Sequence, residues 1–385
     1  MIGYSESLGR RFESYRAHHF LFGKPIAMPI RSWMIYGANG YSAQLIAEWA
    51  RERDLTPILA GRNPGKTRAI AERLGFDWRA FSLDDPQVIA ESLNDIDAVI
   101  HCAGPFSATS APMIDAYLRA RTHYFDITGE IPVFEHAHSD QIDAAAKEAG
   151  IVICPGIGFD VVPTDCLAKA LVEALPDATH LDLGFHGSMS VSPGTAKTIV
   201  ETLGYGTFAR RKGVVVNIPL HVRDIDYGKG PRQSLSVSWG DVSTAFYTTG
   251  IENITVYWPA NDAMIRQFRF SRLLRPLLRL RSVQNFIKGQ IEKKVEGPNQ
   301  EKRDQQHVHI WGEVRNATGK TISARITTAN GYTVTQLAPV AIVEHLLRHD
   351  VPAGSITPAL LMGKDFVSRL DGSSEIKETE LRNSD

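Results

Sequence analysis

The sequence is poor in several features that would narrow its function at once. It has three cysteines, and their spacing matches neither a zinc site, a redox pair nor an even disulfide framework; they are Cys102, Cys154 and Cys166. A reducing, cytoplasmic setting is the simple interpretation.

The formal net charge is −1, so no overall basic field favours nucleic acid. We therefore expect no nucleic-acid partner.

Long apolar runs are also missing. No run approaches the roughly 20 residues that a membrane-spanning helix needs. Near the N-terminus, the apolar stretch 19–22 is far too short for the core of a secretion signal. We expect residues 1–29 to form a poorly ordered extension.

From Trp33 to Cys154, short apolar runs alternate with helical stretches, which is the pattern of repeated β-α-β units. Asn63-Pro64 and Asp85-Pro86 are typical helix starts. The sequence thus predicts an α/β fold, with a doubly wound, Rossmann-type parallel sheet in residues 30–160. The expected strands are 33–36, 56–59, 79–83, 98–102, 124–127 and 151–154.

After Leu175 the apolar runs become rich in β-branched and aromatic residues. This predicts a second, α+β domain built on a mainly antiparallel sheet, a substrate or roof domain over residues 161–330. A helix expected at 336–347 indicates that residues 331–370 return to the first domain. The polar residues 371–385 are typical of a flexible tail.

The stretch 37–43, Gly-Ala-Asn-Gly-Tyr-Ser-Ala, separates the first expected strand from an amphipathic helix. Its glycines would permit a tight turn and the close approach of a diphosphate, and the first N–H groups of the helix would face the anion. A plain strand-to-helix turn explains the glycine pair equally well. The predicted cofactor contacts in this loop are Gly37, Ala38, Asn39, Gly40, Tyr41 and Ser42.

The end of the second expected strand bears on the choice of dinucleotide. NAD sites carry an acid there for the ribose 2′-hydroxyl, whereas NADP sites place an arginine against the 2′-phosphate. This chain has no acid at that point and has Arg62, with Lys66 one turn further on. A solvated surface arginine is the alternative. We predict that the cofactor is NADP(H), and we expect no metal.

Later strand ends would supply the substrate side of the site. The turn Ala103-Gly104-Pro105 could meet the nicotinamide ribose or be a generic loop. Carboxylates near the next strand ends could orient a substrate or move a proton, and they could equally cap helices. The catalytic candidates are Tyr124, Asp126, Asp160 and Tyr205, and the substrate-binding candidates are Phe106, Glu130, Phe159 and His186. A buried tyrosine or histidine at such places is more often a packed core residue.

Together, the segments GANGYSA, LAGRN, CAGPFS, HYFDITGE and GFDVVPTD resemble the saccharopine dehydrogenase-like oxidoreductases, a family that includes trans-acting enoyl reductases. The resemblance extends from about Arg31 to Leu370. It implies an NADP-binding Rossmann domain, a second domain that covers the nicotinamide, and a C-terminal return to the first domain. It also implies contacts to the diphosphate from Gly37, Gly40 and Ala43, to the 2′-phosphate from Arg62, and on the nicotinamide side from Gly104 and Pro105.

On these grounds we predict an NADPH-dependent oxidoreductase. Its expected substrate is a small molecule, hydrophobic or carrier-linked, with an enoyl-type carbon–carbon double bond. The alternative reaction is reduction of an imine formed from an amino acid and a keto acid. The alternative class is a non-catalytic protein that keeps the NADP fold and binds a membrane or a protein partner.

The basic amphipathic segment 265–294 mixes arginines with leucine and phenylalanine. Such a segment can lie on an anionic membrane or on an acidic partner, which would make the protein peripheral to a membrane. We favour an ordinary helical pair that covers the second domain or forms a dimer contact, with arginine stems lying over apolar surface.

Overall fold

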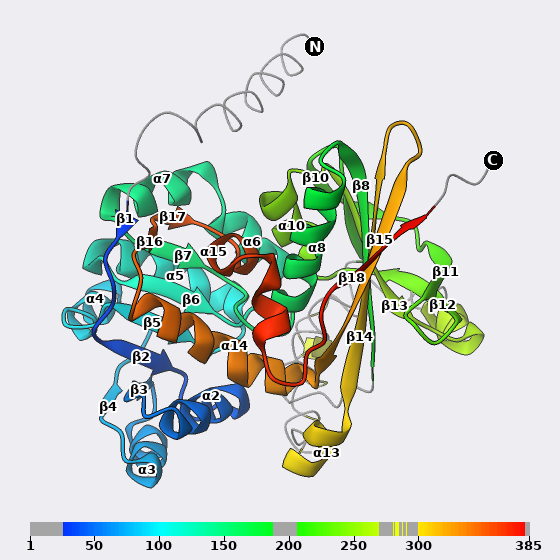
Figure 1. Ribbon diagram of the computed structural model, residues 1–385. Coiled ribbons are helices and arrows are strands. Elements are labelled where there is room, and N and C mark those ends of the chain that lie inside the picture. Colours follow the sequence, from blue (N-terminus) through cyan, green and yellow to red (C-terminus); the bar gives the residue numbers. More distant parts are fainter. Residues whose placement is uncertain are drawn as a thin grey trace.

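Two large sheets lie side by side in the computed structural model, with helices between them (Figure 1). The structure describes residues 26–187, 206–268 and 299–381, and between the last two ranges residues 280, 282–284, 287 and 290. Residues 1–25 of the predicted extension, the candidate Tyr205 and most of the segment 265–294 lie outside the described residues.

The first sheet is parallel and has seven strands, in the order β17-β7-β6-β5-β2-β3-β4. Its first six strands along the chain follow the Rossmann order, which reverses between β2 and β5. This confirms the predicted fold class, and it places the loops after β2 and β5 next to each other. The strands are β2 (Trp33–Tyr36), β3 (Ile58–Gly61), β4 (Trp78–Ala80), β5 (Ala98–His101), β6 (His123–Asp126), β7 (Val152–Cys154) and β17 (Gly354–Ser355).

Helices cover both faces of this sheet because its central strands are apolar on both sides. In β2, Trp33 and Ile35 belong to one core, whereas Met34 and Tyr36 belong to the core on the opposite face. One face is covered by α2 (Tyr41–Glu52), α3 (Pro64–Leu74) and α14 (Gly331–Leu346), and the other by α4 (Pro86–Ser92), α5 (Phe106–Ala120), α6 (Ile131–Ala137) and α7 (Asp140–Ala149).

In the described parts of the chain, the second sheet has nine strands and is mainly antiparallel, as predicted. In the part of the chain that the structure describes, β8 and β13 form a parallel pair and the other pairs are antiparallel. The strands are β8 (Ala178–Gly187), β9 (Thr207–Arg211), β10 (Val214–Ile218), β11 (Val222–Asp226), β12 (Pro231–Val237), β13 (Asn253–Pro259), β14 (His307–Asn316), β15 (Thr321–Ala329) and β18 (Lys377–Leu381).

The last strand differs from the sequence-based expectation. Residues 377–381 were expected in the flexible tail, but they form β18, which pairs with β15 from Thr321 to Arg325. The polar composition misleads here because an edge strand can satisfy its backbone on one side and leave its side chains in water.

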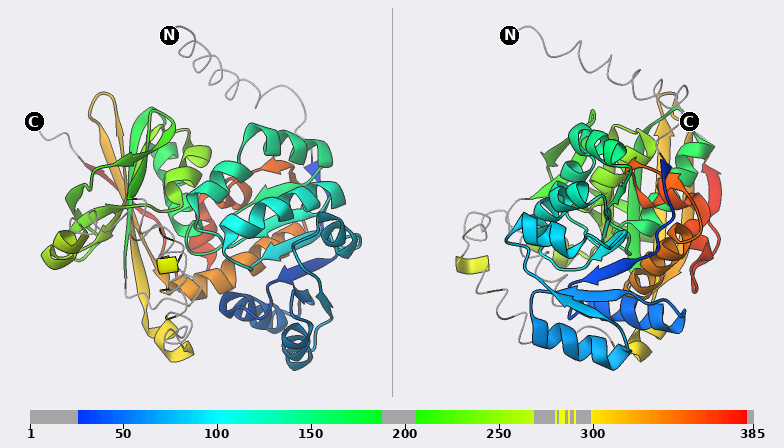
Figure 2. Two further views of the ribbon diagram at one scale, coloured as in Figure 1. Left: turned by 180° about the vertical axis from the view of Figure 1, so that it is seen from behind. Right: turned by 90° about the vertical axis from the view of Figure 1, so that its left-hand side faces the viewer.

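Two helices lie between the sheets, α8 (Val162–Ala174) and α10 (Asp241–Thr249) (Figure 2). α8 packs closely on the second sheet, where a Cβ on Gly312 of β14 would lie 2.7 Å from a Leu171 methyl group. The buried Arg210 of β9, in the second sheet, also forms an ion pair with Glu135 of α6, which covers the first sheet.

The C-terminal third of the chain crosses back to the first sheet. α14 packs against α2, β16 (Val351–Pro352) pairs with β1 (Ile26–Ala27), and β17 joins the sheet beside β7. α15 (Pro358–Met362) and the 3-10 helix η1 (Lys364–Arg369) then pack on α8, while α13 (Gln300–Gln305) precedes β14.

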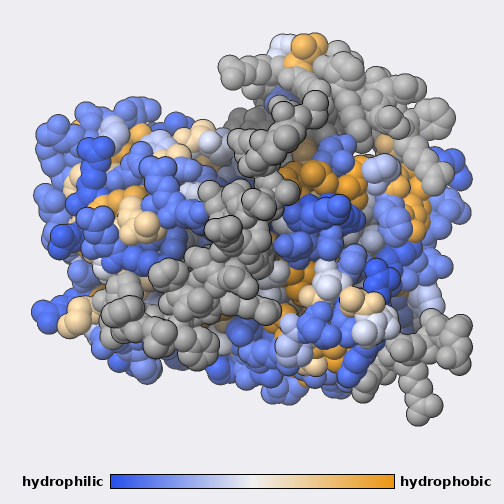
Figure 3. Space-filling model, turned by 90° about the horizontal axis from the view of Figure 1, so that it is seen from above, coloured by the Kyte–Doolittle hydropathy of each residue, from blue (hydrophilic) through white to orange (hydrophobic). Residues whose placement is uncertain are grey.

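The face shown in Figure 3 is mainly hydrophilic, with the hydrophobic residues in separate patches. Among the described residues, no helix is both long and apolar enough to cross a membrane.

Candidate functional site

The loops that follow β2 and β5 meet at the point where the strand order reverses. Gly37 has a φ of +90°, which favours glycine. A Cβ on Gly37 would lie 2.9 Å from both the Ala103 nitrogen and the Cys102 carbonyl carbon. The Cys102 N–H donates to the Tyr36 carbonyl at 2.8 Å. A side chain at position 37 would therefore push the two loops apart.

The start of α2 is open to an anion. Gly40 is its N-cap residue, and among the described residues no side chain caps the helix start; its first turn carries no acid. The partial positive charge of the helix end is thus not neutralised from within the helix. Ala43 is fully buried, which lets α2 lie close to the sheet.

Arg62 stands at the end of β3, next to this glycine loop. Arg62 and Lys66 are both exposed, and for neither side chain is a hydrogen bond or an ion pair present within the described residues. Asn39 of the loop lies close, since its Oδ1 would be 3.6 Å from a Cβ on Gly61. The Asn63 side chain, and not Arg62, serves as the N-cap of α3: its Oδ1 accepts from the Lys66 N–H at 3.0 Å.

The sequence did not single out Arg303, which the structure brings to the same place. This residue of α13 donates to the Tyr41 hydroxyl at 3.0 Å, and Tyr41 begins α2. The Tyr41 ring also meets the Tyr332 ring edge-on at 5.1 Å. The second half of the chain thus supplies a cation at the start of the helix, although no short motif around Arg303 signals this.

The turn Ala103-Gly104-Pro105 leads into α5, and Gly104 and Pro105 are exposed. Glu130 holds the start of that helix, because its carboxylate accepts from the Phe106 N–H at 3.0 Å and from the Ser107 N–H at 2.8 Å. Phe106 packs edge-on against His101 at 5.4 Å. The structure therefore places Glu130 and Phe106, both substrate candidates, where they shape the turn.

Tyr124 and Asp126 are fully buried in the first domain. The Tyr124 hydroxyl donates to Asp126 at 2.5 Å, and the same carboxylate accepts from the N–H groups of Thr128 at 2.9 Å and Gly156 at 2.8 Å. Burial raises the pKa of Asp126 to about 6 and that of Tyr124 well above its ordinary value. This pair links the ends of β6 and β7, and neither side chain reaches the surface.

Asp160 has a different environment, being only partly buried. It lies against Gly129, where a Cβ would come within 2.8 Å of Asp160 Oδ2. Within the described part of the chain, no hydrogen bond or ion pair engages its carboxylate, and α8 has no side-chain cap. The predicted alternative, helix capping, is therefore wrong for Asp160. Burial raises its pKa to about 6.

Aromatic side chains of the second domain stand next to Asp160. The Trp239 indole N–H donates to the Asp160 carbonyl at 3.0 Å. The Phe185 ring centroid lies 4.6 Å from that of Trp239 and 4.7 Å from that of Trp258. We call Phe185, Trp239 and Trp258 the aromatic wall. Both tryptophans are partly exposed, so the wall offers apolar surface beside an ionisable group.

Two further substrate candidates lie in unlike places. Phe159 is buried behind Asp160, where it packs edge-on against Phe185 at 6.3 Å, so it supports the aromatic wall. His186 follows Phe185 in β8 and points to the other face of the second sheet, towards Tyr227 and His309. Because successive side chains of a strand alternate, Phe185 and His186 cannot serve the same site.

Residues 33–154 match the family model described as saccharopine dehydrogenase NADP binding domain. This region is therefore similar to the NADP-binding domain of saccharopine dehydrogenases. The resemblance inferred from the sequence motifs is thereby confirmed.

Curated relatives extend the likeness. A trans-acting enoyl reductase of Mycobacterium ulcerans is 26% identical over 224 residues, which cover 54% of this chain and 53% of the relative. A trans-acting enoyl reductase of Mycobacterium tuberculosis is 30% identical over 139 residues, covering 34% of this chain and 33% of the relative. The chain thus spans about half the length of the first of these relatives.

Solved structures agree on the fold. A saccharopine dehydrogenase (L-Glu forming) from Saccharomyces cerevisiae superposes with a TM-score of 0.59 at 12% identity, covering 94% of this chain and all of that one (100%). A homospermidine synthase from Legionella pneumophila, solved in complex with NAD, superposes with a TM-score of 0.60 at 12% identity. The match covers 91% of this chain and 91% of that one.

The residues of this region fit NADP(H) as the cofactor. Backbone atoms of Cys102 and Ala103 occupy the space that a Cβ on Gly37 would fill. The N–H groups at the start of α2 are suited to bind a diphosphate. At the end of β3 a free arginine stands where an NAD-binding domain would carry an acid.

Gly37→Ala should abolish measurable NADPH binding and lower the unfolding temperature, because its Cβ would meet backbone atoms 2.9 Å away. Gly75→Ala is the matched control, since Gly75 has a φ of +76° and a Cβ there would meet nothing within 4 Å. It should lose roughly 1 kcal/mol through backbone strain and still bind NADPH. Equal NADPH affinity of the two variants, measured by fluorescence titration, would contradict the assignment of the glycine loop.

Proposed function

We propose that the protein is an NADPH-dependent reductase of a carbon–carbon double bond conjugated to a carbonyl, in an apolar or carrier-linked small molecule. The observation that carries this proposal is Asp160, an ionisable group without a partner among the described residues and next to the aromatic wall. The names of the curated relatives, trans-acting enoyl reductases, favour the same reaction.

The loops at the point where the strand order reverses would supply the cofactor contacts. The N–H groups at the start of α2 would bind the diphosphate, and Arg303 would add a positive charge beside Tyr41. The Arg62 guanidinium would bind the 2′-phosphate, with Lys66 as a second cation. The exposed turn Gly104-Pro105 would then lie along the nicotinamide ribose, on the side of the sheet where Glu130 holds α5.

The reaction needs a bound hydride donor and a proton donor from the chain. When bound, NADPH supplies a hydride, which the β-carbon of the double bond accepts. The electron pair of the double bond moves towards the conjugated carbonyl, and the α-carbon then needs a proton. Asp160 would donate that proton and be left as a carboxylate, to be protonated again from water. Because burial raises its pKa to about 6, Asp160 keeps a protonated fraction at a pH where an ordinary aspartic acid has almost none.

The aromatic wall favours an apolar substrate. Phe185, Trp239 and Trp258 can pack on a hydrocarbon chain, but they offer no cation for the carboxylates of an imine made from an amino acid and a keto acid. The bond between the Trp239 indole and the Asp160 carbonyl would keep the acid at a constant distance from the bound chain. Reduction of an enoyl-type double bond is therefore the function that we assign.

Arg62→Gln should weaken NADPH binding by about 10- to 100-fold, because it removes charge-assisted hydrogen bonds to the 2′-phosphate. NADH, which lacks that phosphate, should bind the variant and the unaltered protein equally well. Arg51→Gln, an exposed arginine at the other end of α2, is the control and should change neither affinity. Unchanged NADPH affinity in Arg62→Gln, or a preference of the unaltered protein for NADH, would overturn the assignment of Arg62.

With an enoyl thioester as substrate, the single-turnover rate of NADPH oxidation should be constant below about pH 6. Above this pH it should fall about tenfold per pH unit, because Asp160 must be protonated to donate and its pKa is raised to about 6. Asp160→Asn should lower the rate at pH 6 by roughly 10²- to 10⁴-fold and leave NADPH affinity unchanged. Asp115→Asn, at an exposed site on α5, is the control and should keep the full rate.

An imine formed from an amino acid and a keto acid belongs in the same assay. If the imine alone is reduced, the proposed substrate class is wrong. If neither is reduced while NADPH binds, the non-catalytic alternative gains support. An unaltered rate in Asp160→Asn would remove this residue as the proton donor.

A further inference from the structure

A polar pocket lies on the outer face of the second sheet, the face turned away from α8. In β8, Leu181 and Leu183 are buried in the core that contains α8, so the alternating residues His180 and Asp182 point to the opposite face. The Asp160 side of the molecule and this pocket are thus on different faces of the sheet. Neither the family match nor the proposed reductase reaction uses the pocket.

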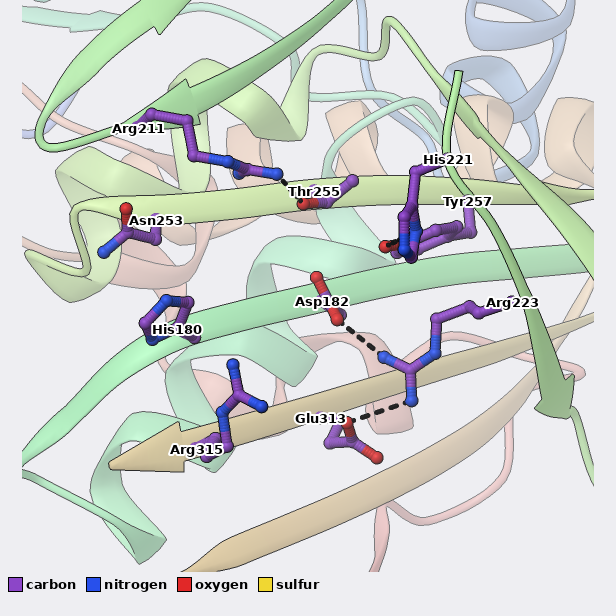
Figure 4. A pocket seen from close by; sticks show the side chains of 10 residues that line it. All are labelled: His180, Asp182, Arg211, His221, Arg223, Asn253, Thr255, Tyr257, Glu313 and Arg315. Carbon is purple, nitrogen blue, oxygen red and sulfur yellow. Dashed lines mark hydrogen bonds and ion pairs between the residues drawn. The ribbon is translucent and has the colours of Figure 1, made fainter. Parts of the chain in front are cut away.

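The pocket has a volume of about 460 Å³, enough for a small organic ligand. Its walls come from β8, β9, β11, β13 and β14 and the residue before β11. They are formed by His180, Asp182, Arg211, His221, Arg223, Asn253, Thr255, Tyr257, Glu313 and Arg315. Figure 4 shows Arg211 and Arg315 on opposite sides of His180 and Asp182, with His221 and Tyr257 at one end.

One of the three arginines is neutralised within the pocket. Arg223 donates to Asp182 at 2.6 Å and to Glu313 at 3.1 Å, and it also lies 5.0 Å from the Trp311 ring. Both carboxylates of the pocket are therefore engaged by the same guanidinium. The pocket is lined by three arginines and two carboxylates, so its arginines outnumber its acids by one.

The other two arginines have no acidic partner among the described residues. Arg211 is held in place by neutral acceptors, namely the carbonyls of Arg210 at 2.7 Å and Ile254 at 3.2 Å and the Thr255 hydroxyl at 2.9 Å. Arg315 is exposed and stands opposite His180 in the register of β14 with β8. A guanidinium held by neutral acceptors and an exposed one thus line the same pocket.

We propose that this pocket binds a phosphate monoester, with the phosphate between Arg211 and Arg315. Two guanidinium groups without acidic partners match a group that carries nearly two negative charges at neutral pH, and the planar fork of arginine suits phosphate oxygens. The volume exceeds that of a phosphate alone, so the organic part of the ligand lies towards Tyr257 and His221. Those two side chains already bond to each other at 3.0 Å, which fixes that end of the pocket.

His180 gives this proposal a local readout. Burial lowers its pKa, as do the charges of Arg315 and Arg211, while Asp182 acts in the opposite direction. A phosphate placed between the two arginines offsets their effect and therefore raises the pKa of His180. The chain has 13 histidines, so the His180 ring signals are assigned by comparison with His180→Gln.

The test is an NMR titration of the full-length protein, with labelled histidine rings, using inorganic phosphate and then glycerol phosphate at constant ionic strength. The Arg62→Gln background removes the arginine proposed for the cofactor phosphate, so the outcome does not depend on the proposed function. We expect saturable binding, an upward shift of the His180 pKa, and tighter binding of glycerol phosphate than of inorganic phosphate.

Arg315→Gln and Arg211→Gln should each weaken binding at least about tenfold. Arg232→Gln removes an exposed arginine of the same sheet that does not line the pocket, and it should have no effect. Unchanged phosphate affinity in both pocket variants would overturn the proposal. A His180 pKa that does not change when phosphate is added would overturn it as well. Saturation by succinate and not by either phosphate would also overturn it in favour of a carboxylate ligand.

Discussion

The close approach of Gly37 to the backbone of Ala103 is the contact on which the rest of the site depends. It holds the loop after β2 against the loop after β5, at the point where the strand order reverses. Around this contact lie the start of α2, the exposed Arg62 after the next strand, and the exposed turn at Gly104. A single Cβ at Gly37 would push apart the two loops that we propose for the diphosphate and for the nicotinamide.

Most carboxylates around the site hold the fold, whereas Asp160 is partly exposed and has no hydrogen-bond partner among the described residues. Glu130 caps α5, Asp126 joins two strand ends, and Asp165 of α8 accepts from the Ala359 N–H at 2.8 Å and from Thr248. Buried acids need such partners, because an unpaired charge away from water is costly. Asp160 lacks them within the described residues. Its neighbour Asp241 is fully buried, and burial, together with the charges of Asp165 and Asp160, raises the pKa of Asp241 well above its ordinary value.

Local sequence signals sufficed for the first domain and for the cofactor. The glycine spacing, the proline-marked helix starts and Arg62 each lie within a short segment, so they could predict the β-α-β units and the dinucleotide without knowledge of distant residues. The relations between distant segments could not be predicted in this way. The contact of Arg303 with Tyr41 joins residues far apart in the chain, and the role of Glu130 depends on how α5 meets the end of β6. A strand pattern also does not tell which of its two faces meets the other domain, so the sequence could not show that His186 points away from Phe185 and the aromatic wall.

A structure of the protein with NADPH bound tests the central claim most directly. The account predicts the 2′-phosphate on Arg62, the diphosphate at the start of α2 near Arg303, and the nicotinamide beside Gly104 and Pro105. Its C4 atom should face a space bounded by Asp160 and Trp239. A 2′-phosphate held away from Arg62, or a nicotinamide with Asp160 and the aromatic wall out of reach of C4, would contradict the account.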